Sequence, residues 1–572
     1  MRRHGRDNYF VVGEGIYTID ENDNPVFQRP STLAELRKFR FSRLGPQGDP
    51  IDDSARQTFE TLAEAMTSAG AADPDSDNPP IPAGFTYLAQ FVDHDLTKDV
   101  TDVHLGQDVT VAELLQGRSP SLDLDSLYGR GPDKDPQFYA SDQVRIKTGT
   151  TQAVPFPPDV PEANKPHAGF DLPRVGSGST KAARRTANIP DARNDENLAV
   201  AQTHLMFIRF HNAVVNKLAA GTPSVLLFPT ARRDVVLHYQ WMLRTDFLPR
   251  IVDPAIVDDV YTNGRKFFEI AQEYSDENLY AYPGPDDPHV QPGDTPTMPV
   301  EFSIASYRLG HSMVRGAYQW NAAFNSKVQR IATLHLLFQF SGTSGILSPG
   351  NLNIDDPEAG NFEVLPSNWI ADFRRLYDFN DAGRADLVLP KEDSNIAKKI
   401  DTLLVNPLHD LPLGSFGGRG AMPVATGRAL NLAFRNLTRA GMVRLASGQQ
   451  MAAMMGIPVL TPDQVIKGAG AGANFDTAPN NLNDGQKTFL GEHTPLWFYI
   501  LREAELNDGR LTGVGGRIVA EVFHRAMEGS RYSIVRDPAW RPFFGPDPDT
   551  FRMVDLCLFA VEGNVTALAP LG

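Results

Sequence analysis

A row of polar and ionisable residues interrupts the otherwise apolar segment 85–96. It contains Gln90, Asp93, His94 and Asp95. Side chains of this kind are costly to bury unless they have a partner or a ligand. At the period of a helix, Gln90, Asp93 and His94 fall on one face and Asp95 points elsewhere. The spacing therefore predicts a helix that presents an imidazole, an amide and a carboxylate to one pocket, and a second carboxylate to another site.

A second candidate cluster lies at residues 191–198, where a long helix is expected to begin. Arg193, Glu196 and Asn197 are three or four positions apart, so they share one face of a helix. Two interpretations remain open. Either Arg193 and Glu196 form a solvated pair behind Asp191 as a helix cap, or Arg193 points into a pocket.

A third cluster, at residues 306–313, contains Arg308, Gly310 and His311. Arg308 and His311 share a helical face, so a cation and an imidazole could reach the same ligand. Gly310 has no side chain beside His311, which would let a planar ligand approach the backbone. For a lone histidine, a hydrogen-bonded position in the core is the alternative.

A fourth cluster alternates oxygen-bearing side chains along a short loop, at Ser119, Ser121, Asp123 and Asp125. Oxygen donors suit a hard cation such as Ca²⁺, which takes about six to eight of them. A solvated acidic turn is the competing interpretation, and the loop sequence is compatible with both.

Composition limits the classes of protein that remain. The 572 residues carry a net charge of −16, which argues against nucleic acid as the main partner because phosphate binding requires clustered cations. A single cysteine, Cys557, excludes an intramolecular disulfide and a thiolate metal cluster. No apolar run reaches bilayer length, and no signal peptide is recognised after Met1. We expect no membrane span, and a protein that is cytoplasmic or secreted by a non-classical route.

The elements that must position these clusters are mostly helical. Strand-like alternation is rare, and residues 131–174 are rich in Pro, Gly and Asp, so they predict a long irregular connection. The glycine-rich segment 468–473 lacks the strand and spacing of a dinucleotide loop and predicts a flexible surface loop. Helical spacing of apolar residues recurs at 198–211, 235–249, 304–311, 329–340, 431–445, 494–506 and 517–527.

These patterns predict a mainly α fold, with a single large helical domain, long loops and little β structure. We see no internal repeat or low-complexity linker that would divide the chain further. Residues 1–80 mix short extended pieces with polar turns and are predicted to form an N-terminal extension that wraps the core. Residues 81–572 would form the main domain.

Taken together and in chain order, the clusters resemble the motifs of the animal-type haem peroxidases, the family of myeloperoxidase and lactoperoxidase in the peroxidase–cyclooxygenase superfamily. The stretch from Gln90 to Asp95 resembles the distal-haem motif of that family. Residues 307–312 resemble its proximal motif, and residues 122–129 resemble its calcium loop. Further similar stretches occur at 240–249, 435–439 and 515–521, particularly to bacterial members, so the resemblance runs from about residue 80 to about residue 530.

This resemblance implies haem b as the cofactor, with His94, Arg193 and Gln90 on its distal side. His311 resembles the proximal iron ligand, and Asn436 resembles the residue that hydrogen-bonds its other ring nitrogen. The remaining implied roles concern the haem periphery and a Ca²⁺ ion. Asp93 and Glu196 match the carboxylates that form ester bonds to haem, Arg308 is expected beside the cofactor, and Asp95, Ser119, Ser121, Asp123 and Asp125 match the calcium ligands, with Ser121 contributing its carbonyl.

The expected chemistry explains these residue types. A peroxide must lose a proton from one oxygen and gain a proton on the other, which a neutral imidazole such as His94 can mediate. Arg193 would stabilise the charge that develops on the separating oxygens. An amide acceptor, Asn436, would fix the tautomer of His311.

The implied function is an enzyme that reduces hydrogen peroxide to water through a ferryl intermediate, with a role in the response to oxidative stress. Its reductants would be small phenols, aromatic amines, halides or thiocyanate. Asn197 stands where myeloperoxidase has a methionine bonded to haem, which argues against strong chloride oxidation and favours bromide, iodide or thiocyanate.

Two alternatives belong to different classes. One is a haem-dependent fatty-acid dioxygenase, although the radical tyrosine of the cyclooxygenases lies three residues before the proximal histidine, where this chain has Arg308 next to Tyr307. The other is a non-catalytic calcium-binding adhesion or scaffold protein with the same fold. The intact set of Gln90, His94 and Arg193 argues against a scaffold.

Overall fold

The computed structural model describes most of the chain and all of the candidate clusters. The described residues are 8–11, 15–19, 25–28, 40–67, 77–101, 103–269, 295–341, 356–358, 360–411, 427–470, 472–477 and 482–572. The Pro- and Asp-rich segments 73–80 and 282–299 are predicted to be loops, and residues 73–76 and 282–294 within them lie outside this set.

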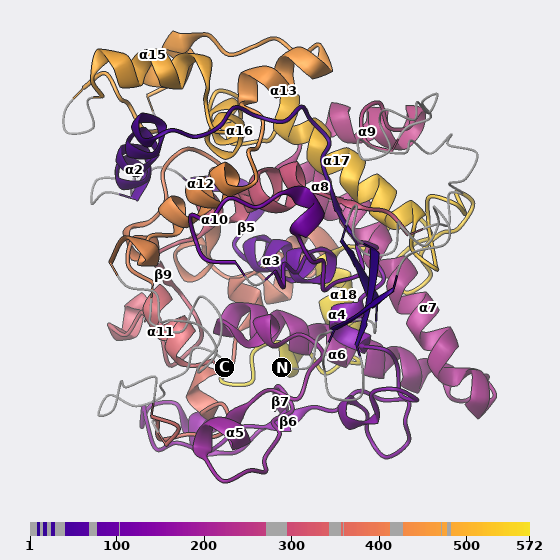
Figure 1. The fold of residues 1–572 in the computed structure, drawn as a ribbon. Helices are drawn as coiled ribbons and strands as arrows, with labels where there is room; N and C mark the ends of the chain where they lie inside the picture. Colours follow the sequence, from indigo (N-terminus) through magenta and orange to yellow (C-terminus); the bar gives the residue numbers. More distant parts are fainter. Residues whose placement is uncertain are drawn as a thin grey trace.

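Helix α3 (Gly84–Leu96) lies near the centre of the molecule and is surrounded by helices from distant parts of the chain (Figure 1). All of its residues except Gln90 are buried. The helix ends at Thr97, which has an extended backbone. The helix predicted from the polar row is therefore present, and it is enclosed on almost every side.

Helix α6 (Leu198–Leu218) packs along α3 and is covered in turn by α7 (Ser224–Met242). Phe91 of α3 stacks on Phe207 of α6, with ring centroids 4.5 Å apart and planes inclined by 12°. Helix α7 continues through a π-helical turn into α8 (Leu248–Ile251), so the predicted helical stretch across 235–249 is confirmed. These contacts fix one side of α3.

The other side of α3 faces the segment that carries His311. A π-helical turn (Glu301–Ala305) and a 3-10 turn (Ser306–Leu309) lead into the short helix α10 (Gly310–Met313), which contacts α3. Three helices pack around this segment: α12 (Leu432–Met442), α16 (Leu496–Glu505) and α17 (Gly513–Glu528). All three were predicted from their apolar spacing.

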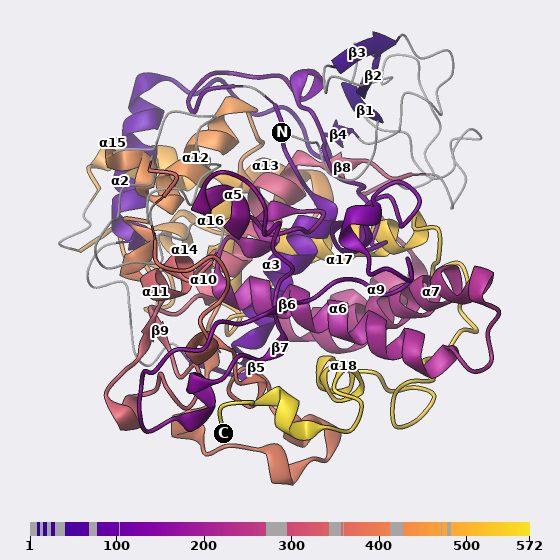
Figure 2. The same cartoon turned by 90° about the horizontal axis from the view of Figure 1, so that it is seen from below.

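Strands in the described residues are short and peripheral. β1 (Asn8–Val11), β2 (Gly15–Ile19) and β3 (Pro25–Gln28) form an antiparallel sheet away from the helical body (Figure 2). The other sheets have two strands each: β4 (Phe41–Ser42) with β8 (Met298–Pro299), β5 (Asp77–Pro82) with β11 (Ile396–Lys398), β6 (Gly149–Thr150) with β7 (Ala168–Asp171), and β9 (Ala317–Tyr318) with β10 (Ala332–Thr333). The prediction of a mainly α fold with little β structure is confirmed.

Some elements differ from the sequence-based expectations. Residues 53–67, placed among extended pieces and turns, form helix α2 (Asp53–Thr67), which buries Phe59, Leu62 and Met66 and packs against α12 and α15 (Asp484–Glu492). The helix expected at 329–340 is reduced to α11 (Leu334–Gln339), because β10 precedes it.

Several shorter helices carried no predicted pattern: α4 (Asp125–Tyr128), α5 (Lys181–Arg185), α9 (Pro254–Asn263), α13 (Gly448–Met455), α14 (Pro462–Lys467) and α18 (Met553–Ala560). The separation of residues 1–80 as an extension stays a prediction. Across the parts of the chain that the structure describes, no helix is long and apolar enough to cross a bilayer.

The described residues of the glycine-rich segment are held by hydrogen bonds that its composition did not predict. The segment lies at the surface but is anchored to a buried ion pair, in which Arg502 Nη1 lies 2.6 Å from Glu505 Oε2. The backbone N–H groups of Ala469 and Gly472 donate to Glu505 Oε1 at 3.0 and 3.1 Å. A Cβ atom at Gly472 would lie 1.9 Å from Glu505 Oε2. The glycine is needed here for close approach of backbone to a carboxylate.

This packing predicts that Gly472→Val lowers the free energy of unfolding by about 1–3 kcal/mol, because the new side chain must displace the Glu505 carboxylate. Chemical denaturation monitored by circular dichroism measures the change. The matched control is Gly221→Ala, at a position where an added Cβ meets no atom within 4 Å. Equal midpoints for the two variants would contradict the anchored loop.

Candidate active site

His94 lies in the last turn of α3 and is almost completely buried, with 4% of its surface exposed. Its Nδ1 atom lies 2.8 Å from Oδ1 of Asn194. Because an amide oxygen can only accept, Nδ1 carries the proton and Nε2 is left as the basic nitrogen. Burial, reinforced by the neighbouring charge of Arg193, lowers the pKa of His94 to about 4. The side chain is therefore a neutral imidazole near pH 7.

Arg193 is held beside His94 by Asp191. Asp191 accepts from Arg193 Nε at 3.1 Å and from Nη2 at 2.8 Å, and Nη2 also donates to the backbone carbonyl of His94 at 3.1 Å. Asp191 caps the 3-10 helix Ala192–Asp195 and is fully buried. The structure therefore shows Asp191 both as the cap of this turn and as the ion-pair partner of Arg193, whose side chain is 28% exposed.

Asp191 also belongs to a larger buried network of charges. Arg118, whose side chain is inaccessible to solvent, bonds to Asp191 through Nη2 and to Asp125 Oδ1 through Nη1 at 3.0 Å. Burial alone would raise the pKa of Asp191, but Arg193, Lys98 and Arg118 together lower it well below its ordinary value. A row of ionised groups therefore joins the loop of Asp125 to Arg193.

Gln90 is oriented by Asn197. Asn197 Nδ2 donates to Gln90 Oε1 at 2.9 Å, while Asn197 Oδ1 accepts from Val200 N at 3.0 Å and caps α6. With its oxygen engaged in this way, Gln90 has its amide N–H groups left to donate. Asn197 thus determines that Gln90 offers hydrogen-bond donors, and not its oxygen, on the face of α3 that it shares with His94.

Asp93 is the point at which the two halves of the site meet. Arg308 Nη1 lies 3.7 Å from Asp93 Oδ2, and Thr97 Oγ1 donates to Asp93 Oδ1 at 3.0 Å. The charge of Asp93 also acts on Glu196. Burial raises the pKa of Glu196 to about 7, although Arg193 and Arg308 oppose the rise. Two carboxyl groups and a guanidinium from three separate segments therefore face one another.

His311 lies across from this group, and the charges of Arg308 and Asp93 both act on it. Burial lowers the pKa of His311 to about 3, with Arg308 adding to the effect. The ring of Trp497 lies edge-on, 6.3 Å away between centroids.

Asn436 Nδ2 lies 2.9 Å from His311 Nδ1, so the pairing of these two residues matches the one that the resemblance implied. Its polarity is the reverse of the expected one, because the amide nitrogen and not the oxygen faces the ring. In this orientation Nε2 of His311 carries the proton. Coordination of a metal through Nε2 requires the Asn436 amide to turn by 180°, which exchanges two groups of nearly equal size.

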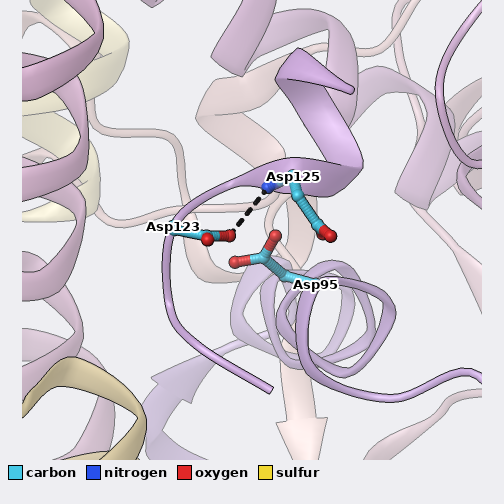
Figure 3. Close-up of side chains that lie close together, drawn as sticks. All are labelled: Asp95, Asp123 and Asp125. Carbon is cyan, nitrogen blue, oxygen red and sulfur yellow. Dashed lines mark hydrogen bonds between the residues drawn. The ribbon is translucent and has the colours of Figure 1, made fainter. Parts of the chain in front are cut away.

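The three acidic residues predicted around a cation lie together behind α3. One carboxylate oxygen from each of Asp95, Asp123 and Asp125 lies within 4.8 Å of the other two. Figure 3 shows Asp95 pointing from its helix toward the loop that carries the other two. Burial and the negative charges of Asp125 and Asp123 raise the pKa of Asp95 well above its ordinary value. The cluster therefore has the charge and donor type that a Ca²⁺ ion would neutralise.

The two serines predicted with this cluster lie at its edge. Ser119 donates from its hydroxyl to Asp123 Oδ2 at 3.3 Å and from its backbone N–H to Asp125 Oδ2 at 3.1 Å. The carbonyl of Ser121 accepts from the backbone N–H of Asp123 at 2.9 Å.

Sequence reasoning missed Asn194 and Arg118, and it did not indicate that His204 bonds through Nδ1 to Asn194 Nδ2 at 2.9 Å. Asn194 sits between Arg193 and Glu196, but nothing in the pattern indicates which way its amide points. Arg118 carried a signal, since it directly precedes the acidic loop.

The fold is shared with solved structures of a peroxidase and of fatty acid dioxygenases. Peroxidase A from Dictyostelium discoideum superposes with a TM-score of 0.52 at 13% identity, over 99% of this chain and 98% of that chain. The fatty acid alpha-dioxygenase of Oryza sativa superposes with a TM-score of 0.51 at 11% identity, over 98% of this chain and 87% of that one. At such identities the likeness concerns the fold alone.

Within this class, residues 85–357 match the family model described as animal haem peroxidase. Residues 85–357 are therefore recognised as an animal haem peroxidase domain. It is 33% identical over 132 residues to a peroxidase-like protein of Margaritifera margaritifera and 28% identical over 145 residues to a chorion peroxidase of Drosophila melanogaster. These stretches cover 22% and 25% of this chain, but only 14% and 16% of the two relatives.

The buried carboxyl of Glu196 makes stability depend on pH. Because its pKa is raised from 4.5 to about 7, the folded protein keeps a proton that the unfolded chain releases between these values. Stability is therefore lost as the pH rises through this window. The variant Glu196→Gln cannot lose a proton, so its free energy of unfolding should rise relative to that of the wild type as the pH increases. In the cofactor-free protein, the difference between variant and wild type should be roughly 1–2 kcal/mol larger at pH 8 than at pH 4, a value reduced because the side chain is partly exposed.

Urea denaturation at the two pH values measures this difference. Glu492→Gln, at an exposed position of α15, provides the control and should show none. The same stability increment for Glu196→Gln at both pH values would mean that Glu196 is not held as an uncharged acid.

Proposed function

We propose that this protein is a haem peroxidase that reduces hydrogen peroxide to water and oxidises a small organic or halide reductant. The observation that carries the proposal is a pair of neutral histidines, His94 and His311, that both feel the charge of Asp93. His94 has the guanidinium of Arg193 beside it, and His311 has the amide of Asn436 against its Nδ1 atom. This is the donor set that such chemistry requires.

The donor types of these residues fit a haem. His311 would hold the iron through Nε2, with Asn436 turned so that its oxygen accepts from Nδ1. Arg308 could pair with a propionate. Bound haem would supply a redox-active metal that takes electrons from the reductant and passes them to peroxide.

Asp93 and Glu196 would form ester bonds at the edge of the haem. Both carboxyl groups lie near Arg308, and neither needs a further cation once esterified. Asn197 cannot form the third, sulfonium link, because an asparagine has no sulfur atom; its amide is instead engaged with Gln90 and the helix cap.

The distal residues divide the work on peroxide. Nε2 of His94 takes the proton from the near oxygen and returns it to the far one, which leaves as water. Arg193, fixed by Asp191, stabilises the negative charge on the departing oxygen. Gln90 donates its N–H to a water or an anion on the same face. An anion held by such a donor is consistent with bromide, iodide or thiocyanate as a reductant, alongside phenols and aromatic amines.

The test is to express the chain with haem supplementation, purify it, and record the Soret band and the oxidation of guaiacol or bromide by peroxide. His311→Ala should lose the Soret band. His94→Ala should keep it and lower the rate of reaction with peroxide by about 10²–10⁴-fold. The protein is not a haem peroxidase if the supplemented wild type shows no Soret band, or if His94→Ala turns over like the wild type.

Fatty-acid oxygenation is the second candidate function, because the fold is shared with a fatty acid alpha-dioxygenase. Tyr307 is buried and stacked on Phe302 with centroids 4.7 Å apart. Oxygen uptake with a fatty acid, abolished by Tyr307→Phe, would favour this function over the first. A scaffold without turnover is excluded by either activity.

We also propose that Asp95, Asp123 and Asp125 bind Ca²⁺ with Ser119 and the carbonyl of Ser121. Isothermal titration of the chelator-treated protein should show one site, and calcium should raise the thermal midpoint by mass action. Asp123→Asn should weaken binding by more than about tenfold. Asp463→Asn, whose side chain is exposed and far from the loop in sequence, is the control. Absence of binding heat in the wild type contradicts the site.

A further inference from the structure

We propose that Asn194 is a positioning residue that fixes the tautomer of His94, and that His204 fixes Asn194. The inference rests on the proposed function, because it concerns the residue assigned there as the base toward peroxide. The three side chains form one buried hydrogen-bonded row, His94–Asn194–His204.

The amide of Asn194 has a fixed polarity between the two rings. Its oxygen lies 2.8 Å from His94 Nδ1 and its nitrogen 2.9 Å from His204 Nδ1. An amide oxygen accepts and an amide nitrogen donates, so His94 is protonated on Nδ1 while His204 is protonated on Nε2. The lone pair of His94 is thereby placed on Nε2, the nitrogen that points away from Asn194. With the opposite amide orientation, Nε2 of His94 would carry a proton and could not act as a base.

His204 is the partner of the amide nitrogen of Asn194. It lies on α6, has no exposed surface, and packs its ring edge-on against Phe91 at 5.7 Å between centroids. Burial lowers the pKa of His204 to about 3, so the ring stays neutral and one of its two nitrogens is an acceptor. In the observed pairing that acceptor is Nδ1, because the amide nitrogen of Asn194 can only donate, and the amide oxygen is left for His94.

The backbone of Asn194 is as firmly held as its side chain. Asn194 is buried in the same 3-10 turn as Arg193, and its backbone N–H donates to the carbonyl of Asp191 at 3.0 Å. One short turn therefore orients both distal groups: Asp191 holds the guanidinium, and Asn194 holds the imidazole. A shift of this turn would move the base and the cation together.

The first measurement is the tautomer of His94 by ¹⁵N NMR of histidine-labelled, haem-free protein, with the signal assigned by its loss in His94→Gln. We expect Nδ1–H in the wild type and in Asn194→Asp, which keeps an acceptor toward His94. Asn194→Leu and Asn194→Ser should show a substantial Nε2–H fraction, and His204→Leu should give a mixture because the amide is free to rotate. A wild-type His94 protonated on Nε2 overturns the proposal without any variant.

The second measurement is the rate of reaction of the haem-loaded protein with peroxide in stopped flow. Asn194→Leu should lower kcat/KM for peroxide by about 10–100-fold while kcat/KM for the reductant is unchanged, as expected for the loss of a residue that orients a catalytic group. Asn194→Asp should stay close to the wild type. The matched control is Asn216→Leu, the same substitution at an exposed position on α6.

The two measurements separate this inference from the proposed function. If the haem-loaded wild type does not react with peroxide, the proposed function fails, while the tautomer of the haem-free protein still decides the role of Asn194. If peroxide reacts equally fast with the wild type and Asn194→Leu, and His94 keeps its tautomer in that variant, the inference fails and the proposed function stands. Should Asn194→Leu not fold, Asn194→Ser supplies both values.

Discussion

Helix α3 must bury a histidine and two carboxyl groups in the centre of a large helical protein, and the rest of the site follows from this constraint. A buried ionisable group needs a partner, a neutral form or a bound ion. The structure supplies the first two. His94 is neutral and hydrogen-bonded to Asn194, and Asp93 faces Arg308. Asp95 lies against two further aspartates, an arrangement that is electrostatically unfavourable without a cation.

Arg118 and Asp191 connect the acidic cluster to the residues around His94. Arg118 neutralises part of the acidic cluster and bonds to Asp191, which in turn fixes Arg193 beside His94. Removal of one member would leave its neighbours charged and unpaired in the interior, which is strongly destabilising. The cation site and the distal face of the active site are thus parts of one electrostatic unit, although they lie on opposite sides of α3.

Much of the helical architecture could be predicted because apolar spacing reports which face of a segment is buried. α3, α6, α12, α16 and α17 follow that rule. α2 follows the same rule, because Phe59, Leu62 and Met66 recur at helical spacing and pack against other helices, although it was not predicted. Elsewhere, tertiary contacts decided. The glycine-rich segment is anchored by Glu505, a residue more than thirty positions away along the chain.

For the candidate site, the sequence by itself determined which residue types are present and which of them share a helical face, since periodicity is local. It separated Asp95 from His94 and pointed to His311 and Asn436 through family resemblance. Only the tertiary structure decided that Arg193 pairs with Asp191, that Asn197 orients Gln90, and that the amide of Asn194 lies between two histidines. Which end of an amide donates to a given neighbour depends on what its other end bonds to, and that second partner comes from another segment of the chain.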